Sequence, residues 1–284
     1  MALVSHRGVI TTYDITSTKI HRTVNHALVE YPPASSAATL RWFLTDIVRD
    51  TNLLKNMFFS SHSTGWHLAL DEVRGHKVEL SMDDIADTLR ECGVKLNTIF
   101  FDACCCANIE ILHRMRHIAK YVVAFETFCP WEGLIAYDNM LSPDPKSIAR
   151  MHLQRFEGRE MRPDEQASDV AVLSTERAAS VYTALMDLVA SDKSDFIDVF
   201  SNPEYPYHEE SETMRQYDVV ALLDHISATD PRRAQRARAL RALILGEVIQ
   251  FYAKSKTHQL KTYGLSMFQD RIKILPDKGS KFLF

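Results

Sequence analysis

Residues 97–126 read NTIFFDACCCANIEILHRMRHIAKYVVAFE and decide the fold of this chain. The two ends of this stretch, 97–103 and 120–126, are short apolar runs typical of buried strands. Between them, apolar side chains recur at helical spacing and predict one buried helix face over 107–119. These side chains are Ile109, Leu112, Met115 and Ile118. A strand, a crossover helix and a second strand predict a parallel sheet.

The same alternation extends toward the N-terminus. Residues 56–62 form another apolar run that predicts a strand. Ser81, with Asp84 three residues later, forms a capping box that begins a helix. This helix extends through Leu89 and is closed by Gly93. Three strands joined by crossover helices therefore predict an α/β fold.

The flanking regions are less regular, and no internal repeat or biased linker marks a domain boundary. We expect a single domain over 1–284, with its core in 8–140 and C-terminal helices and a strand in 141–284. Further elements are a hairpin of 8–16 with 19–30 at the sheet edge, a helix from Ser35 or Ser36 through Asp50, a helix that starts at Ser174, and a helix over 232–253.

Composition excludes several classes of protein. Of the 284 residues, 46% are hydrophobic and 25% charged, with only 9 Gly and 10 Pro, which excludes disordered and collagen-like chains. Lys and Arg number 33 against 37 Asp and Glu, so the net charge is -4. That balance gives no overall attraction to nucleic acid or anionic lipid, and it argues against nucleic acid as a partner.

The sequence also bears on location. No stretch approaches the roughly 18 apolar residues that a membrane span needs, and residues 1–8 lack the apolar core of a signal peptide. The chain has five cysteines, an odd number, and three of them are adjacent, which suits a reducing compartment better than a disulfide framework. We therefore predict a cytoplasmic protein that makes no membrane contact.

Two of the predicted strands end in residues of catalytic potential. His62 ends the first strand, and Cys104 follows the second. Because the carboxyl ends of parallel strands meet at one edge of a sheet, these side chains can share a crevice. Cys104 also precedes a predicted helix, whose N-terminus favours a thiolate. The pattern predicts a Cys-His dyad, although a structural role for either residue remains open.

Several segments resemble, in order, motifs of one protein family. Ser61-His-Ser-Thr-Gly-Trp66 resembles the His-Gly-x-Gly-Trp motif of the clostripain family of cysteine peptidases, and 101–110 resembles its Phe-Asp-Ala-Cys segment. The other similar segments are 124–127 with Pro130, Gly133 and Tyr137, then 173–174, then 263–268. The resemblance implies the caspase-like α/β fold, a three-layer sandwich with a mostly parallel central sheet flanked by helices.

The resemblance also implies roles for individual residues. It makes Cys104 the nucleophile and His62 the base, with the backbone N–H groups of Ser63 and Cys104 binding the oxyanion. Asp102 lies two residues before Cys104 on the strand and shares its face, so its carboxylate could receive an Arg or Lys side chain of a polypeptide substrate. Glu126, in the similar segment 124–127, is a second predicted substrate-binding residue. We expect no required cofactor, and the resemblance makes calcium the one candidate.

The same residues also allow interpretations without catalysis. Asp102 could instead accept backbone N–H bonds near the helix start. Ser63 and Phe125 replace the Gly and Ser of the family motifs, so the chain could be a catalytically silent binding or regulatory module. Relatives usually begin with an additional strand and helix that we do not find in this sequence. We therefore expect an open sheet edge, which an activating or other protein partner could cover.

Two further clusters suggest other ligands. Cys104, Cys105 and Cys106, with His113 and His117 one helical turn apart, suggest zinc. Three adjacent cysteines cannot converge on one tetrahedral ion without strain, so we disfavour that site.

A second cluster is the run of arginines over 231–241, which suggests phosphate contacts or a docking surface. The alternative, a solvated face opposite Leu240, Ile244 and Val248, fits the acidic total better. Because Arg at a helix N-terminus opposes the helix dipole, we expect a carboxylate near it.

Overall fold

The structure is a computed structural model of the 284-residue chain. It describes residues 2–6, 9–15, 20–25, 36–73, 76–127, 129–130, 144–158, 168–190, 208–209, 215–256 and 262–268.

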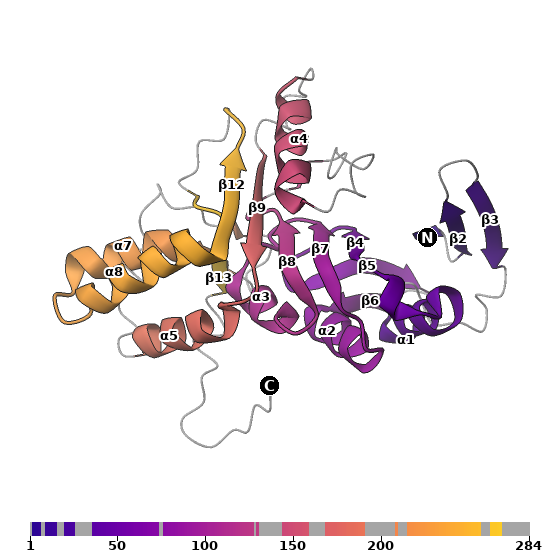
Figure 1. Ribbon diagram of the computed structural model, residues 1–284, viewed down its shortest axis with the longest axis horizontal. Helices are drawn as coiled ribbons and strands as arrows, with labels where there is room; N and C mark the ends of the chain where they lie inside the picture. Colours follow the sequence, from indigo (N-terminus) through magenta and orange to yellow (C-terminus); the bar gives the residue numbers. More distant parts are fainter. Residues whose placement is uncertain are drawn as a thin grey trace.

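A five-stranded sheet forms the centre of the described part of the chain (Figure 1). Its order is β12 (Ile249–Lys254), β9 (Asp169–Ser174), β8 (Ala119–Ala124), β7 (Leu96–Asp102) and β4 (Asn56–Ser60). The three strands predicted from sequence, β4, β7 and β8, are parallel neighbours, as expected. Only β9 among these five strands runs in the opposite direction, because it is antiparallel to both β8 and β12. The predicted fold class, with a mostly parallel sheet, is confirmed.

Side chains alternate between the two faces of this sheet and divide the core in two. On β7, Ile99 and Phe101 join the larger hydrophobic cluster, whereas Phe100 between them joins the smaller one. The larger cluster includes side chains from α2 (Met82–Glu91), α3 (Ile109–Met115), α5 (Ala178–Ala190), α7 (Val219–Thr229) and α8 (Ala234–Leu243). The smaller cluster is closed by α4 (Pro145–Glu157). Helices on both faces of a sheet make the expected three layers (Figure 1).

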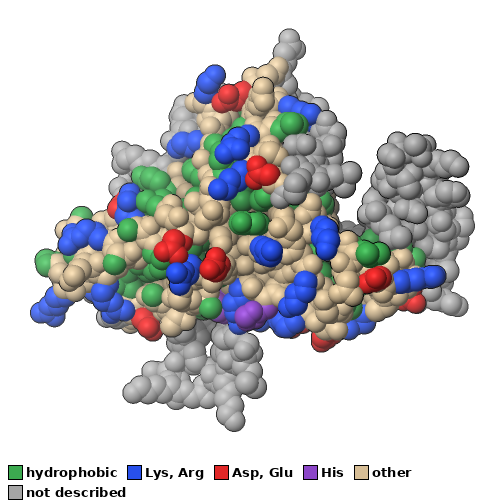
Figure 2. All heavy atoms as spheres, viewed as in Figure 1, with side chains coloured by type: hydrophobic (Ala, Val, Ile, Leu, Met, Phe, Trp, Pro, Cys, Tyr) green, Lys and Arg blue, Asp and Glu red, His purple; other side chains and the backbone are tan. Residues whose placement is uncertain are grey.

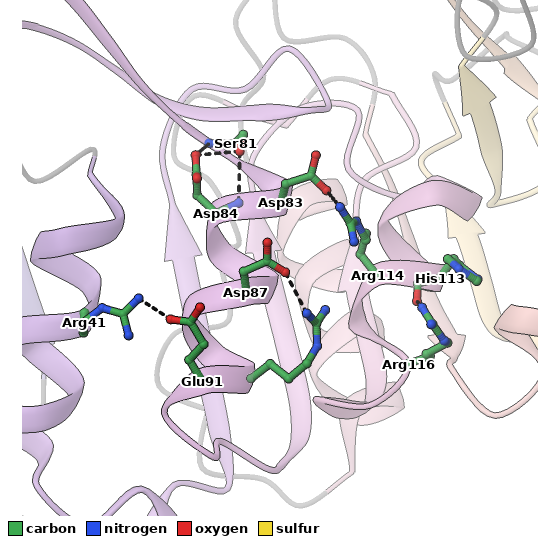
Figure 3. Close-up of polar contacts among 10 residues, drawn as sticks. Arg41, Ser81, Asp83, Asp84, Asp87, Glu91, His113, Arg114 and Arg116 are labelled. Carbon is green, nitrogen blue, oxygen red and sulfur yellow. Dashed lines mark hydrogen bonds and ion pairs between the residues drawn. The ribbon is translucent and has the colours of Figure 1, made fainter. Parts of the chain in front are cut away.

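Polar contacts fix helix α2 among its neighbours (Figure 3). The predicted capping box is present: the Asp84 N–H donates to the Ser81 hydroxyl, and the Ser81 N–H donates to the Asp84 carboxylate. Arg41 of α1 (Ala37–Trp42) pairs with Glu91 at the end of α2. Arg114 of α3 pairs with Asp83 in the first turn of α2. The sequence prediction for this helix is therefore confirmed together with its cap.

Smaller sheets and short helical turns complete the described residues. The sheets are β1 (Ala2–His6) with β2 (Val9–Ile15) and β3 (Ile20–Asn25), β5 (His67–Val73) with β6 (His76–Ser81), and β10 (His208–Glu209) with β11 (Arg215–Asp218) and β13 (Ser266–Phe268). The turns are η1 (Phe43–Val48), η2 (Thr51–Leu53) and η4 (Ile244–Val248). Ser36 caps α1, which continues through η1, so the helix predicted to run to Asp50 is confirmed through Val48.

The predicted hairpin near the N-terminus forms, but elsewhere than expected. β2 pairs with β3 in the antiparallel register that a hairpin needs. The prediction placed this hairpin at the edge of the central sheet, which is wrong. β2 instead pairs with β1 on its other side, in a separate three-stranded sheet. Among the described strands, β4 and β12 form the edges of the central sheet.

Two predicted helix boundaries are also wrong. Ser174 does not start a helix: it ends β9, opposite Tyr121 of β8, and α5 begins only at Ala178. The helix predicted over 232–253 ends in η4, and 249–254 form β12, because hydrogen bonding to β9 outweighs a local apolar pattern that fits either conformation.

The C-terminal half contributes to the central sheet itself. β9 and β12 come from beyond residue 141, and one hydrophobic cluster extends from Leu40 to Phe268. The single-domain organisation over 1–284 stays a prediction.

Candidate active site

The carboxyl ends of β4 and β7 bring the predicted dyad residues to one edge of the sheet. Ser60, the last residue of β4, is in register with Asp102, the last residue of β7. The Ser61 N–H continues the pairing by donating to the Asp102 carbonyl at 3.2 Å. His62 and Cys104 therefore each follow a paired residue by two positions, on adjacent parallel strands. The sequence predicted this shared edge, and the register supports it.

The two turns beyond these strands contact each other. The Ser63 hydroxyl lies 3.4 Å from the Cys106 thiol, and the Cys106 thiol contacts the Cys104 carbonyl at 3.3 Å. Ser63 and Cys106 are buried, whereas His62 is exposed and Cys104 is half-buried. Buried contacts thus hold the turns together, while the two predicted catalytic side chains remain accessible from solvent.

The turn that carries Cys104 has an unusual backbone. Cys105 has a φ of 59°, in the left-handed region that a residue with a Cβ seldom occupies. Its N–H donates to the Thr127 carbonyl at 2.8 Å, and its carbonyl accepts a hydrogen bond from the Asn108 side-chain Nδ2 at 3.2 Å. These bonds hold the strained residue directly beside Cys104.

The donor to the Cys104 sulfur differs from the one predicted. Helix α3 begins at Ile109 with Asn108 as its N-cap, so Cys104 lies four residues before the cap rather than in the first turn. The Cys129 N–H donates to the Cys104 Sγ at 3.3 Å instead. The sequence gives no signal for this contact, because Cys129 lies 25 residues away along the chain.

Ser63 fits its position without backbone strain. The family motif has Gly there, but Ser63 does not have a positive φ, so it needs no glycine freedom. Its hydroxyl accepts the Gly65 N–H at 2.8 Å. Gly65 has a φ of 87°, and a Cβ there would lie 2.9 Å from the Cys105 carbonyl oxygen. Glycine is therefore required at 65, where the first turn packs against the second.

Asp102 is the last residue of β7, and both of its carboxylate oxygens accept hydrogen bonds from other side chains. It is 3% exposed. Its Oδ2 accepts the Ser60 hydroxyl at 2.8 Å, and its Oδ1 accepts the Cys129 thiol at 3.3 Å. Burial and the neighbouring carboxylate raise the pKa of the Cys129 thiol, which therefore stays protonated at neutral pH. The predicted carboxylate is thus next to Cys104, with the Cys129 side chain against it.

Glu126 occupies a different environment from the one that a substrate-binding role needs. It is 1% exposed, and its Oε2 accepts the Gly264 N–H at 2.6 Å. Burial, with the carboxylates of Asp218 and Asp169 nearby, raises the pKa of Glu126 well above its usual range. Burial likewise raises the pKa of Asp169 to about 7 and that of Asp218 to about 6.

Hydrogen bonds from this carboxylate cluster join distant segments of the chain. Asp169 Oδ1 accepts the N–H groups of Glu126 and Thr127, and Asp218 Oδ2 accepts the Tyr263 N–H. This arrangement argues that Glu126 supports the structure. Its substrate-binding role stays a prediction that the burial does not favour.

The zinc alternative gains no support from the described residues. His113 stacks on Tyr182 with ring centroids 4.5 Å apart, and burial lowers the pKa of His113 to about 4. Among the residues that the structure describes, no group of three or more His, Cys, Asp and Glu side chains could hold a metal ion.

The arginine run has partners within the chain. Arg233 pairs with Asp230 at 2.6 Å, and Asp230 is the carboxylate expected near the helix start. Arg241, in the last turn of α8, pairs with Asp224 at 2.6 Å. The predicted apolar side, which includes Leu240, is buried. Figure 2 shows basic side chains at the end formed by α7 and α8, and acidic side chains interspersed with basic ones elsewhere on the face in view. The structure therefore favours the solvated-face interpretation.

The fold has three layers, a central sheet with helices on both faces, and a thiol and an imidazole lie beyond the carboxyl ends of neighbouring strands. This combination defines a caspase-like α/β protein of the cysteine hydrolase type. The sequence model of the clostripain family, peptidase family C11, matches residues 28–271. The chain belongs to this family and is a cysteine peptidase, as the sequence motifs predicted.

Solved structures support the same fold. An inactive zymogen C11 protease from Parabacteroides distasonis matches with a TM-score of 0.64 and 16% identity, over 92% of this chain and 77% of that one. A secreted C11 cysteine protease from Bacteroides thetaiotaomicron, in complex with an irreversible peptide inhibitor, matches with a TM-score of 0.66 and 14% identity. The match covers 98% of this chain and 83% of that one. No curated protein matches the chain.

Two positions of the family resemblance, Gly133 and Tyr137, lie outside the described residues. Within the described part of the chain, no helix is long and apolar enough to cross a membrane.

Proposed function

We propose that this peptidase is an endopeptidase that uses Cys104 as the nucleophile and His62 as the base, and that it cleaves after Arg or Lys. The observation that carries this proposal is the register of β4 with β7, which places both residues two positions beyond a paired Ser60 and Asp102. The half-buried thiol and the exposed imidazole are both accessible to a polypeptide.

The chemistry follows from these positions. His62 takes the proton of the Cys104 thiol, and the sulfur attacks the peptide carbonyl carbon. The Cys129 N–H, 3.3 Å from the sulfur, stabilises the thiolate before attack. The backbone N–H groups of Ser63 and Cys104 hold the oxyanion. His62 then gives its proton to the leaving amine, and water hydrolyses the acyl-enzyme in the reverse sequence of steps.

The proposed preference for basic residues rests on Asp102. Its carboxylate is two residues from Cys104 along the chain and 3% exposed, so a paired guanidinium or ammonium would be largely removed from water. The Cys129 thiol occupies Asp102 Oδ1 at 3.3 Å. A substrate Arg or Lys would therefore displace Cys129 from that oxygen.

Peptidase assays on purified wild type, Cys104→Ala and Cys92→Ala test this proposal. We expect wild type and Cys92→Ala to hydrolyse a peptide amide after Arg, and Cys104→Ala to lose at least about a thousandfold in kcat/KM. Cys92 is a matched control because it is also half-buried and caps the end of α2, away from the site. Equal activity in Cys104→Ala would overturn the assignment. Absence of activity in the wild type would favour the catalytically silent binding module.

Three accompanying predictions have less support from the structure and the comparisons. Cytoplasmic location stays a prediction, and one structural neighbour is described as secreted. Calcium stays a prediction from the family resemblance, for which the described residues offer no ligand group. An activating or edge-covering protein partner stays a prediction, with β4 at one edge of the central sheet among the described strands.

A further inference from the structure

We propose that Cys104 and Cys129 form a reversible disulfide when a hydroperoxide oxidises the site, and that this bond switches the peptidase off. The inference rests on the proposed role of Cys104 as the nucleophile, and it adds a modification site with Cys129 as the resolving thiol. All five cysteines are thiols, with no disulfide between them, in the structure.

The geometry brings the two residues within reach of each other. The Cys129 N–H contacts the Cys104 Sγ at 3.3 Å. Because N and Cβ of one residue are about 2.5 Å apart, the Cys129 Cβ lies no more than about 6 Å from that sulfur. A disulfide brings this separation to about 3 Å, which a side-chain rotation with a small backbone adjustment can supply. No element of the fold has to move.

Accessibility separates this pair from the other thiols. Cys104 and Cys129 are both half-buried, whereas Cys105 and Cys106 are 2% and 0% exposed. Cys106 is also held by the Ser63 hydroxyl at 3.4 Å. Cys92 is half-buried but lies at the other end of its helix from the capping box, after α2. An oxidant that enters from solvent at this edge therefore meets Cys104 and Cys129.

The environment also divides the roles of the two thiols. Burial, the Asp102 carboxylate and the neighbouring sulfurs of Cys104 and Cys106 raise the pKa of the Cys129 thiol. Cys129 is therefore protonated and unreactive toward peroxide. Cys104, which accepts an N–H bond at its sulfur, is the thiol favoured as a thiolate and is oxidised first.

The chemical steps balance. The Cys104 thiolate attacks one peroxide oxygen, the O–O bond breaks, and the leaving alkoxide or hydroxide takes a proton to give an alcohol or water. Cys104 is then a sulfenic acid. Asp102 Oδ1, 3.3 Å from the Cys129 Sγ, relays the thiol proton to the leaving oxygen in the same step as the attack on sulfur. The Cys129 sulfur attacks the Cys104 sulfur, the S–O bond breaks, and the leaving hydroxide takes that proton as water. A dithiol reverses the bond by exchange.

The oxidised state blocks two functions at once. It removes the Cys104 nucleophile, and it fixes Cys129 beside the carboxylate that the proposed substrate side chain needs. Disulfide formation also protects Cys104 from further oxidation to the irreversible sulfinic acid. A peptidase with such a pair would recover after oxidative stress.

The test is a peptide map of the full chain after brief treatment with hydrogen peroxide. Remaining thiols are alkylated, and trypsin then separates peptide 96–114, which holds Cys104, Cys105 and Cys106, from peptide 121–146, which holds Cys129. We expect these two peptides to be cross-linked in wild type, separated by dithiothreitol, and not cross-linked in Cys104→Ala or Cys129→Ser. Cys92→Ser is the control that keeps the cross-link.

Activity gives a second and independent measurement. After peroxide, dithiothreitol should restore at least about fivefold more activity to wild type than to Cys129→Ser, in which Cys104 is oxidised further. A cross-link that persists in Cys104→Ala, or a wild-type map with Cys104 as sulfinic acid and Cys129 alkylated, would overturn the proposal. The map requires no activity, so a cross-linked but inactive wild type would contradict the proposed function and leave the disulfide supported.

Discussion

Strands β7 and β8 are parallel neighbours, and a buried carboxylate lies at the carboxyl end of each. Asp102 ends β7 and is 3% exposed, and Glu126 follows β8 and is 1% exposed. Their partners differ. Asp102 accepts bonds from the Ser60 hydroxyl and the Cys129 thiol, next to the proposed nucleophile. Glu126 lies among other carboxylates and binds the Gly264 N–H.

The difference teaches that burial alone does not assign a role to an acid at a strand end. A carboxylate with hydroxyl and thiol donors beside an accessible sulfur can exchange one donor for a substrate cation. A carboxylate that shares its site with Asp169 and Asp218 keeps protons instead, because like charges cannot all ionise in a buried site. We therefore propose that Asp102 sets the specificity and that Glu126 has a structural role.

The largest effect that separates the two acids is expected from Asp102→Asn. Loss of the charge removes the partner of a substrate Arg or Lys, so the ratio of kcat/KM for an Arg peptide over a neutral peptide should fall about 30-fold or more. Matched peptides that differ only in the residue before the cleaved bond measure this ratio.

The matched control is Glu126→Gln, the same exchange of carboxylate for amide at the end of the next strand. This variant should retain the preference for Arg. If Glu126→Gln loses that preference and Asp102→Asn keeps it, the two assignments are reversed.

A smaller effect is expected from pH on stability. Burial raises the pKa of Asp169 to about 7 in the folded protein, above its unfolded value near 3.8. The protonated cluster therefore stabilises the fold fully below pH 4, and this contribution is lost as the pH rises through about 7. The free energy of unfolding should be lower at pH 8 than at pH 5.

Asp169→Asn separates this contribution from others. An amide keeps an oxygen acceptor for the Glu126 and Thr127 N–H groups but does not titrate. Urea unfolding at pH 5 and pH 8 should show a smaller loss of stability in the variant, by on the order of 1 kcal/mol. An unchanged difference between wild type and variant at the two pH values would show that the cluster is not protonated near neutrality.

The smallest effect is expected from Ser60→Ala. This change removes the 2.8 Å bond to Asp102 Oδ2 and leaves the carboxylate charge in place. We expect a rise in KM for Arg peptides of about threefold or less, with the preference for Arg retained. Steady-state kinetics on the same matched peptides measure it. A larger loss than in Asp102→Asn would mean that Ser60, rather than the acid, carries the specificity.

Local signals in the sequence were sufficient for the part of the fold that places the site. The capping box of Ser81 with Asp84 and the apolar runs of β4, β7 and β8 are decided by neighbours in sequence. Since the carboxyl ends of parallel strands meet at one edge of the sheet, these signals also predicted that His62 and Cys104 lie at the same edge.

Contacts between distant segments explain what the sequence did not predict. Residues 249–254 continue the apolar spacing of the preceding helix, and only pairing with β9 makes them a strand. Glu126 finds Asp169 43 residues away, and Cys129 finds Cys104 across 25 residues. No local pattern marks such partners, because these contacts depend on how distant segments of the chain are arranged in the fold.

The rate at which iodoacetamide alkylates Cys104 tests most directly whether the proposed dyad exists. If the His62 imidazole accepts the thiol proton, Cys104 in wild type should react fastest of the five cysteines at pH 6.5, and His62→Ala should slow it by about tenfold or more. Site-specific mass spectrometry over time measures both rates. Equal rates for Cys104 in wild type and His62→Ala would contradict the account.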